Sequence, residues 1–283
     1  MFFKKVLMAT DFSRPAMQMI DCLDEFQTLG LEEVILVHVI DSRSPGSNSR
    51  SLHVFEQEIL DGLKADIGAM GLEIKVIITI GIPNFEIVRL AEEEQVSLIL
   101  ISSHGRGFIK NILLGSTTNN VIRTTSVPVL IEKYKDVDKE TCRVMCLEKF
   151  KKVLIPLDLS VHSLKLLEEI QGISHLCKEV VILTVIEGAY DAEELDNTII
   201  TRLARLQEKQ KYLEELGLKS KIMIRQGSAS TEIITVAEKE DITLIMLASR
   251  GEGLIKNLLL GSTAHAVIQG SKRPVLLIPS TKQ

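Results

Sequence analysis

The sequence predicts an α/β fold made of two doubly wound domains, each with a five-stranded parallel sheet. The chain of 283 residues carries one sequence pattern twice, at an offset of about 146 residues, so two similar units are expected. Short runs of Val, Ile and Leu alternate with longer segments of helical period, which is typical of β-α-β units. There is no Trp and aromatic residues make up only 4%, so the cores must consist of Ile, Leu, Val and Ala.

The duplication extends over both units. Its most similar stretch is GRGFIKNILLGST at 105–117, which returns as GEGLIKNLLLGST at 251–263. The first strand returns as well, as KKVLMATDFS and then KKVLIPLDLS, and so does the second, as VILVHVID and then VVILTVIE. We therefore predict a first domain at 1–132, a linker at 133–149 with room for one helical turn, and a second domain at 150–283.

Strands and helices alternate within each unit. The strands are apolar runs of about four to eight residues, as expected of buried parallel strands. In the first unit, helices are predicted at 16–29, after Ser13 as N-cap, and at 52–70 and 86–95; the long helix of the second unit is predicted at 194–216. Ligands of doubly wound sheets bind beyond the carboxyl ends of the strands, where the strand order reverses. The residues that directly follow the strands are therefore the candidates for a site.

Charge and composition narrow the class of protein. The formal net charge is −5 and the pI is about 5.8, which argues against a general nucleic-acid surface of clustered Lys and Arg. The N-terminus turns polar too early for a signal peptide, and no apolar run approaches the roughly 18–20 residues of a membrane helix. The four cysteines form no C-x-x-C pair, so we expect a cytoplasmic protein with reduced thiols and no metal site.

An aspartate follows the first strand of each unit. These strands end in Thr10-Asp11 and in Leu157-Asp158. A carboxylate at this place can accept two hydrogen bonds from the hydroxyls of a ribose. The alternative is that it caps the next helix, although Ser13 and Ser160 are near enough to do the capping.

The second strand of each unit ends in HVID or TVIE. The backbone N–H and C=O of Val39 or Val185 can pair with the edge of a base, and the Val side chain can pack on the face of that base. Composition alone indicates no more than the end of a strand here.

The fourth strand leads into a turn of small residues. It continues as Ser102-Ser103-His104-Gly105 in the first unit and as Ala248-Ser249-Arg250-Gly251 in the second, and small residues let a ligand approach the backbone closely. Further on, Gly115-Ser116-Thr117 and Gly261-Ser262-Thr263 open helices. The N–H groups and the positive dipole end of such a helix start favour a phosphate. The alternative is an ordinary helix start capped by Ser or Thr.

Familiar catalytic motifs are absent from these turns. G-x-x-x-x-G-K-[ST] does not occur, and Gly105-Arg106-Gly107 begins a G-x-G-x-x-G pattern in which Lys110 replaces the last Gly. Neither a Ser-His-Asp arrangement nor an evident Mg²⁺-holding pair can be identified. His104 corresponds to Arg250 in the second copy. We therefore expect His104 to position the ligand or to contact a phosphate, and not to transfer a proton.

Taken together, these residues resemble a tandem universal stress protein. The nucleotide-binding signature of that family, G-x2-G-x9-G-[ST], aligns with 102–116 and with 248–262, and the middle Gly, the last Gly and the Ser match in both copies. The Asp after the first strand, the Val of the second strand and the PVL of the last strand also match. Ser102 and Ala248 replace the first Gly. That replacement causes strain if the position needs positive φ and is tolerated if it needs only small size, which we favour.

The resemblance implies a flavodoxin-like, adenine nucleotide α-hydrolase-like domain that binds AMP or ATP, with or without Mg²⁺. It places the Asp at the ribose, the Val backbone at adenine and the glycine loop at the phosphates. It also implies that the last strands, 127–131 and 274–278, pair within the chain into a pseudodimer; a homodimer of whole chains stays open. In the first domain the residues expected to bind nucleotide are Thr10, Asp11, Val39, Ser102, His104, Gly105, Gly115, Ser116 and Thr117. In the second domain they are Leu157, Asp158, Val185, Ala248, Arg250, Gly251, Gly261, Ser262 and Thr263.

We therefore predict a cytoplasmic sensor or regulator in a stress response that binds adenine nucleotide in one or both domains and acts on unidentified protein partners. The second domain departs further from the pattern, with Leu157, Glu187 and Arg250 where the first has Thr10, Asp41 and His104. The alternatives are a nucleotide-free interaction module, since the family includes members that bind no nucleotide, and a slow ATPase. Catalysis ranks last because no catalytic residues can be identified.

Overall fold

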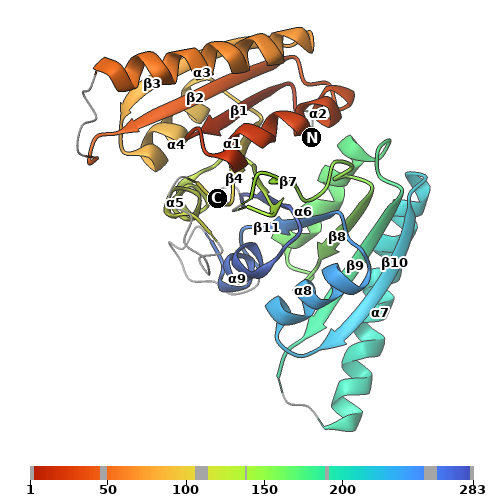
Figure 1. Ribbon diagram of the computed structural model, residues 1–283. Coiled ribbons are helices and arrows are strands. Elements are labelled where there is room, and N and C mark those ends of the chain that lie inside the picture. Colours follow the sequence, from red (N-terminus) through yellow and green to blue (C-terminus); the bar gives the residue numbers. More distant parts are fainter. Residues whose placement is uncertain are drawn as a thin grey trace. The chain divides into compact units, whose positions relative to one another are not determined.

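The computed structural model describes residues 3–44, 50–105, 114–137, 139–188, 191–251 and 260–280, with the backbone alone at 50–56 (Figure 1). Contacts divide the chain into two compact units, Phe2–Leu147 and Glu148–Gln283, here called domain 1 and domain 2. The middle of each glycine-flanked segment, with Arg106, Gly107 and Lys110 in the first copy, lies outside the described residues.

Domain 1 contains a parallel sheet of five strands. Its strands are β1 (Lys5–Thr10), β2 (Glu33–Asp41), β3 (Glu73–Gly81), β4 (Leu98–Ser102) and β5 (Val129–Glu132). They lie in the order β3-β2-β1-β4-β5, and every neighbouring pair is parallel. The helical segments are α1 (Arg14–Met17), η1 (Gln18–Cys22), α2 (Leu23–Thr28), α3 (Arg50–Ala69), α4 (Pro83–Glu93) and α5 (Ser116–Thr124).

Domain 2 repeats this arrangement. Its strands are β8 (Lys152–Pro156), β9 (Glu179–Ile186), β10 (Lys219–Gln226), β11 (Leu244–Ala248) and β12 (Val275–Ile278), in the parallel order β10-β9-β8-β11-β12. Its helical segments are α6 (Val161–Ile170), η2 (Gln171–Ile173), α7 (Ala192–Glu215), α8 (Ala229–Lys239) and α9 (Ser262–Gly270). The predicted fold class, two doubly wound five-stranded α/β domains, is thus confirmed, with a strand order that differs from the 2-1-3-4-5 of flavodoxin itself.

The burial of each strand follows from its place in the sheet. Every residue of the inner strand β4 is buried, whereas burial in the edge strand β3 alternates between half-buried and largely exposed residues. Inner parallel strands are covered on both faces and therefore read as continuous apolar runs. This explains why a composition almost without aromatic residues suffices for the core.

The predicted helix at 16–29 is interrupted. It consists of α1, the 3₁₀-helix η1 and then α2. Ala16, Met19 and Cys22 are all buried, and this spacing of three residues matches the three-residue turn of a 3₁₀-helix. Cys22 and Phe26 are buried four residues apart, with Leu23 buried beside Cys22, which is compatible with the α-helix that follows. The three segments together present one buried face to the core.

The linker also differs from its prediction. In its described part it forms two short antiparallel strands, β6 (Tyr134–Lys135) and β7 (Arg143–Val144), instead of a helical turn. Both strands belong to the domain 1 unit. Among the described helices, none combines the length and hydropathy that crossing a bilayer requires. Pairing of β5 with β12 into a pseudodimer stays a prediction.

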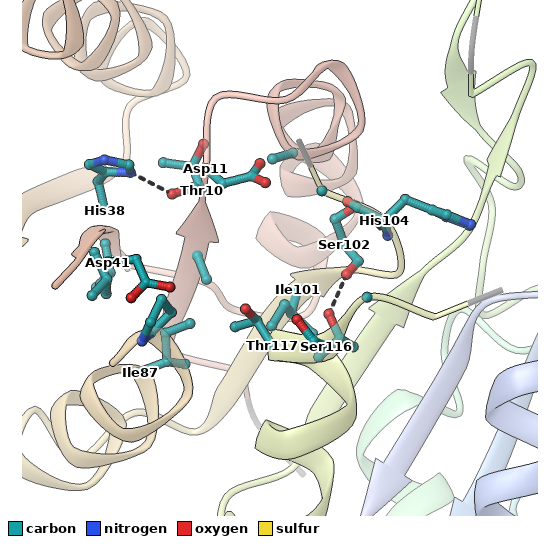
Figure 2. Close-up of a pocket in the computed structure, with 18 of the residues that line it drawn as sticks. Thr10, Asp11, His38, Asp41, Ile87, Ile101, Ser102, His104, Ser116 and Thr117 are labelled. Atoms are coloured by element: carbon teal, nitrogen blue, oxygen red, sulfur yellow. Dashed lines mark hydrogen bonds between the residues drawn. The ribbon is translucent and has the colours of Figure 1, made fainter. Parts of the chain in front are cut away.

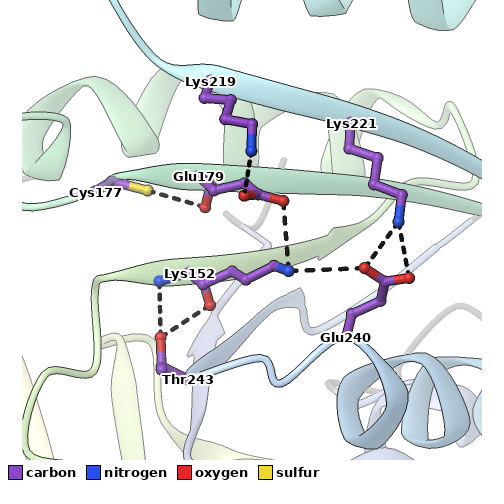
Figure 3. A network of polar contacts seen from close by, with 7 residues as sticks. All are labelled: Lys152, Cys177, Glu179, Lys219, Lys221, Glu240 and Thr243. Atoms are coloured by element: carbon purple, nitrogen blue, oxygen red, sulfur yellow. Dashed lines mark hydrogen bonds and ion pairs between the residues drawn. The ribbon is translucent and has the colours of Figure 1, made fainter.

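A network of ion pairs joins the amino ends of the strands in domain 2 (Figure 3). Lys152 Nζ lies 3.4 Å from Glu179 Oε1 and 3.7 Å from Glu240 Oε2. Lys219 and Lys221 complete it, 3.1 Å from Glu179 and 2.8 Å from Glu240 respectively. The network therefore lies at the end of the sheet opposite the candidate site.

Candidate functional site

A cavity of about 490 Å³ opens at the carboxyl ends of the strands of domain 1 (Figure 2). It lies where strand order reverses, because β1 has β2 on one side and β4 on the other, and ligands of such sheets bind at this place. Every residue predicted from the sequence for domain 1 lines this cavity: Thr10, Asp11, Val39, Ser102, His104, Gly105, Gly115, Ser116 and Thr117. Sheet topology has therefore brought together residues from four separate segments.

Asp11 is held at the end of β1 by its own turn. One carboxylate oxygen, Oδ1, accepts a hydrogen bond of 3.0 Å from the backbone N–H of Ser13. Ser13 in turn is the N-cap of α1, and its Oγ accepts from Ala16 N. The serine therefore caps the helix, as the sequence suggested, and the aspartate side chain is oriented beside the cavity.

Gly105 packs directly against Asp11. A Cβ built on Gly105 would overlap the Oδ2 atom of Asp11, so this position has no room for any side chain while the carboxylate stays in place. The first matched glycine of the signature thus positions the aspartate, a role that the spacing of the sequence motif alone does not reveal.

The end of β1 is fastened to β2 by His38. The buried imidazole has its Nδ1 2.9 Å from the carbonyl oxygen of Thr10, and because a carbonyl only accepts, Nδ1 carries the proton. The ring also stacks on Phe12, with centroids 4.2 Å apart. Phe12 has φ of 61°, the left-handed region that costs energy in a bulky residue and is often found at functional turns.

Val39 follows the last paired residues of β1 and β2, Thr10 and His38. Its backbone therefore extends past the end of β1 and lines the cavity. Pro83 and Ile87 of α4, a helix that contacts β2, give this part of the cavity an apolar wall, and Ile101 of β4 adds an apolar side chain to the lining. A flat apolar ligand with polar groups on its edge fits a wall of this kind beside a strand backbone.

Asp41 closes the same side of the cavity with a negative charge. Arg43 donates from Nε and Nη2 to its carboxylate, at 2.8 and 2.6 Å. These hydrogen bonds hold the pKa of the Asp41 carboxyl below its ordinary value. The carboxylate is therefore ionised at neutral pH.

The amino end of α5 forms the opposite part of the cavity. Gly115 is its N-cap residue and supplies no side-chain cap, and its N–H donates to Ser103 O at 2.8 Å. Ser116 and Thr117 lie in the first turn and line the cavity. The sequence also allowed a Ser or Thr hydroxyl as the cap of this helix. The N-cap residue is instead Gly115, so neither Ser116 nor Thr117 is at the N-cap position. The first-turn amides and the helix dipole form a place for an anion.

Ser102 and His104 shape the turn between β4 and α5. Neither of the described residues Ser102 and Ala248 has a positive φ. Their small size, and not an unusual backbone conformation, therefore explains why they can replace the first glycine of the signature. His104 Nδ1 and Ser103 Oγ share a hydrogen bond of 2.9 Å, whose direction depends on the tautomer of the ring. Figure 2 shows the ring extending away from Asp11. Ser103 is fully buried, so this contact fixes the orientation of the His104 ring.

Domain 2 repeats the turn after its first strand. Asp158 Oδ1 accepts from Ser160 N at 3.0 Å, and a Cβ on Gly251 would overlap Asp158 Oδ2. Leu159 has φ of 66°, as Phe12 has 61°. Both copies thus share the strained turn and the glycine against the aspartate.

In domain 2, a different residue makes the side-chain hydrogen bond between the first two strands. Thr184 takes the place of His38, and its Oγ1 donates to the Leu157 carbonyl at 2.6 Å. Gly261 is the N-cap of α9 and donates to Ser249 O at 2.7 Å, with Ser262 and Thr263 in the first turn. The scaffold of the site is therefore kept.

The cavity of domain 2 differs from that of domain 1. It measures about 220 Å³ and is lined by Asp158, Leu159, Thr198, Thr201, Arg202 and Arg205. Of the residues predicted for this domain, only Asp158 lines it. The others do not, namely Leu157, Val185, Ala248, Arg250, Gly251, Gly261, Ser262 and Thr263. Helix α7 contributes two arginines to this cavity, Arg202 and Arg205, which the sequence analysis did not consider.

Comparison with known proteins agrees with the sequence pattern. A sequence model of the universal stress protein family matches residues 2–133 and, a second time, residues 149–279. The chain belongs to the universal stress protein family. Two domains of this family therefore follow one another in one chain.

Individual relatives support the tandem organisation. Universal stress protein MJ0577 of Methanocaldococcus jannaschii is 39% identical over 158 residues, which cover 47% of this chain and 97% of that protein. Universal stress protein YxiE of Bacillus subtilis is 29% identical over 129 residues, 43% of this chain and 87% of its own. The crystal structure of a universal stress protein from Archaeoglobus fulgidus matches 98% of this chain and 97% of its own, with a TM-score of 0.77 and 26% identity.

Some residues of this universal stress protein that shape the cavities were missed by the sequence analysis. Pro83, Ile87 and Ile101 lie in elements that were predicted, but nothing in their spacing indicates a cavity wall. Arg202 and Arg205 are part of a long helix rich in charged residues, where an arginine usually faces solvent. Within the described ranges, no three His, Cys, Asp or Glu residues gather as a metal site would require.

Proposed function

We propose that domain 1 of this universal stress protein binds an adenine nucleotide, AMP or ATP, and that the bound nucleotide regulates the protein in a stress response. The observation that carries the proposal is the 490 Å³ cavity, which is lined at once by a carboxylate, a strand end beside an apolar wall, and a helix start. The carboxylate suits the ribose hydroxyls, the strand end with its apolar wall suits the base, and the helix start suits the phosphates. Ligand cavities of about 300–1,000 Å³ are usual for molecules of this size.

Each group of the nucleotide has a partner of matching chemistry. The Asp11 carboxylate accepts hydrogen bonds from the ribose hydroxyls. The base lies between Val39 and the wall of Pro83, Ile87 and Ile101, with its amino group donating to the Val39 carbonyl. The phosphates take hydrogen bonds from the first-turn amides of α5, where Ser116 and Thr117 add hydroxyls.

Magnesium fits this scheme as a companion of ATP. Mg²⁺ is usually held by phosphate oxygens, waters and one or two carboxylates, so a dedicated cluster of protein ligands is not required. Asp11 is the carboxylate of the site that packs against Gly105, in the turn after β4. The ion would supply charge neutralisation to the phosphates, and the protein groups would set the orientation of ribose and base.

The test begins with the nucleotide content of the protein. Gently purified chain is denatured, and the released AMP and ATP are identified and quantified by mass spectrometry; calorimetric titration with each nucleotide follows. We expect binding that the substitution Asp11→Ala weakens at least about tenfold, because the ribose loses its acceptor.

A matched variant separates binding from folding. Asp158→Ala removes the same contact to a serine N–H in domain 2, so its loss of stability shows what that contact contributes. A drop in affinity in Asp11→Ala with a comparable change in stability supports the proposal. Absence of released nucleotide together with flat titrations of AMP and ATP contradicts it, and would indicate a nucleotide-free interaction module.

A further inference from the structure

Helix α7 places an arginine on the strand end of domain 2 that corresponds to Val39. The helix packs along β10 and β9 (Figure 1). Arg202 Nη1 donates to the carbonyl oxygen of Val185, at 3.2 Å. One turn further along, Arg205 Nη2 reaches the carbonyl of Leu159 at 3.5 Å. Two guanidinium groups of one helix thus cover the ends of β8 and β9.

The Val185 carbonyl faces the space beyond the end of β8. Leu183 O accepts from Leu157 N, so the backbone groups of Leu183 point toward β8. Residues two apart on a strand point the same way, which turns the Val185 carbonyl to the same side. The last β8–β9 pair is Pro156 with Leu183, so the carbonyl lies past the paired part of β8. This is the atom that an adenine amino group would use.

The arginine belongs to domain 2 alone. Leu206 and Leu213 of α7 are fully buried, as are Leu60 and Ile67 of α3, and these pairs set the register between the two long helices. The register places Glu56 of α3 at the position of Arg202; the side chain of Glu56 is outside the described part of domain 1. The sequence of domain 1 therefore offers no arginine at this point.

Arg202 is well suited to keep a base out. It is half-buried, and a hydrogen bond from a charged donor is stronger than one between neutral groups. An adenine amino group is itself a donor, so it would compete with the guanidinium for one acceptor and meet its positive charge. Arg202 also lines a cavity of about 220 Å³ together with Asp158, so the guanidinium stands close to the aspartate that corresponds to Asp11.

We infer that Arg202 holds the base site of domain 2 closed, so that the chain takes up a single adenine nucleotide, in domain 1. This inference rests on the proposed function, because it assigns the nucleotide to one of two sites with the same scaffold. Asp158, Gly251 and the start of α9 remain in place in domain 2, so removal of the arginine should restore a site rather than build a new one.

The test is a calorimetric titration of the full chain with ATP and with AMP, for wild type and Arg202→Ala. We expect one equivalent on wild type and two on Arg202→Ala. Alanine has the highest helix propensity, so α7 should form as before; a thermal melt checks this. Lys211→Ala removes a positive charge at an exposed position of the same helix, and this control should still bind one equivalent.

A double variant assigns the second equivalent to its domain. In Asp11→Ala with Arg202→Ala, the equivalent bound in domain 1 should bind at least about tenfold more weakly than in Arg202→Ala, while the second equivalent keeps the affinity of the new site. An Arg202→Ala chain that binds no more nucleotide than wild type overturns the inference, and so does a wild type that binds two equivalents. A wild type that binds none contradicts the proposed function instead; one equivalent on Arg202→Ala in that case still supports closure by Arg202.

Discussion

Gly105 lies so close to Asp11 that no Cβ fits between its Cα and the carboxylate oxygen Oδ2. The contact joins the turn after β4 to the turn after β1, across the point where the strand order reverses. Domain 2 has the same contact between Gly251 and Asp158. A glycine of the signature and an aspartate far away in the sequence are therefore one structural unit, which was duplicated as such.

This contact predicts a specific effect of Gly105→Ala. The new methyl group must push the Asp11 carboxylate aside, against the hydrogen bond that Ser13 N–H donates to it. Overpacking of this kind costs about 1–3 kcal/mol of stability, and the displaced carboxylate should weaken nucleotide binding at least about tenfold. Urea denaturation and calorimetric titration measure the two effects.

Gly251→Ala is the matched variant in domain 2. It meets Asp158 in the same way and should cost similar stability, while the affinity of domain 1 for nucleotide should be unchanged. Equal loss of affinity in both variants would show that Gly105 acts through general destabilisation and not through Asp11.

The sequence predicted the scaffold of the site well because strand ends are easy to locate. The apolar runs that end near Asp11, Val39 and Ser102 mark both the ends of β1, β2 and β4 and the residues at the carboxyl edge of the sheet. The 3₁₀ turn at Gln18–Cys22 was not predicted, since helical period alone does not show that burial at a spacing of three continues through Cys22.

Contacts between distant segments could not be predicted in the same way. That Arg202 reaches the Val185 carbonyl depends on where α7 packs on the sheet, and a charged residue on a long amphipathic helix usually indicates a solvated face. The exchange of His38 for Thr184 also looks like loss of a function in the sequence. The structure shows that both side chains donate to the same carbonyl position.

The last glycine of the signature, Gly115, should tolerate what the middle glycine, Gly105, does not. A Cβ on Gly115 would meet Ser103 O at 3.6 Å, an ordinary contact, and Gly115 has φ of −64°. Gly115→Ala should therefore change stability by no more than about 1 kcal/mol. Gly115→Val carries its larger side chain to the start of α5 and should weaken nucleotide binding at least about tenfold with the fold intact.

Circular dichroism melts and titration with ATP separate these outcomes. Affinity should fall in the order Gly, Ala, Val at position 115, while the melting temperature changes little. If Gly115→Val binds nucleotide as tightly as wild type, the phosphates do not lie at the start of α5.

The hydrogen bond between His38 of β2 and the Thr10 carbonyl of β1 predicts that two substitutions of His38 destabilise the protein to different extents. His38→Ala leaves the Thr10 carbonyl without the imidazole donor and removes the ring stacked on Phe12; loss of a buried hydrogen bond of this kind costs about 1–3 kcal/mol. His38→Thr copies the residue of domain 2, where Thr184 donates to Leu157 O. It should recover part of that loss in urea denaturation. Equal destabilisation by Ala and Thr would show that the ring stacking, not the hydrogen bond, matters.

The ion-pair network of domain 2 predicts how stability depends on acid pH (Figure 3). Hydrogen bonds from Lys219 and Lys221 lower the pKa of Glu179 and Glu240 from the ordinary 4.5. A carboxyl whose pKa is lowered by folding stabilises the folded state when ionised, so this stability is complete above pH 4.5 and is lost as the pH falls through the lowered pKa. Both side chains are partly exposed, which limits each pair to about 1 kcal/mol or less.

The double variant Glu179→Gln, Glu240→Gln removes both titrating groups and keeps their shape. Its stability should fall less steeply than that of wild type between about pH 5 and pH 3, since no carboxylate remains there to be protonated. Urea midpoints measured across this range give the two slopes. Added salt should bring the wild-type curve closer to that of the variant, because salt screens partly exposed charges. If the stabilities of wild type and double variant fall in parallel with pH at low salt, the network does not contribute to acid sensitivity. Packing of these side chains would then be its only role.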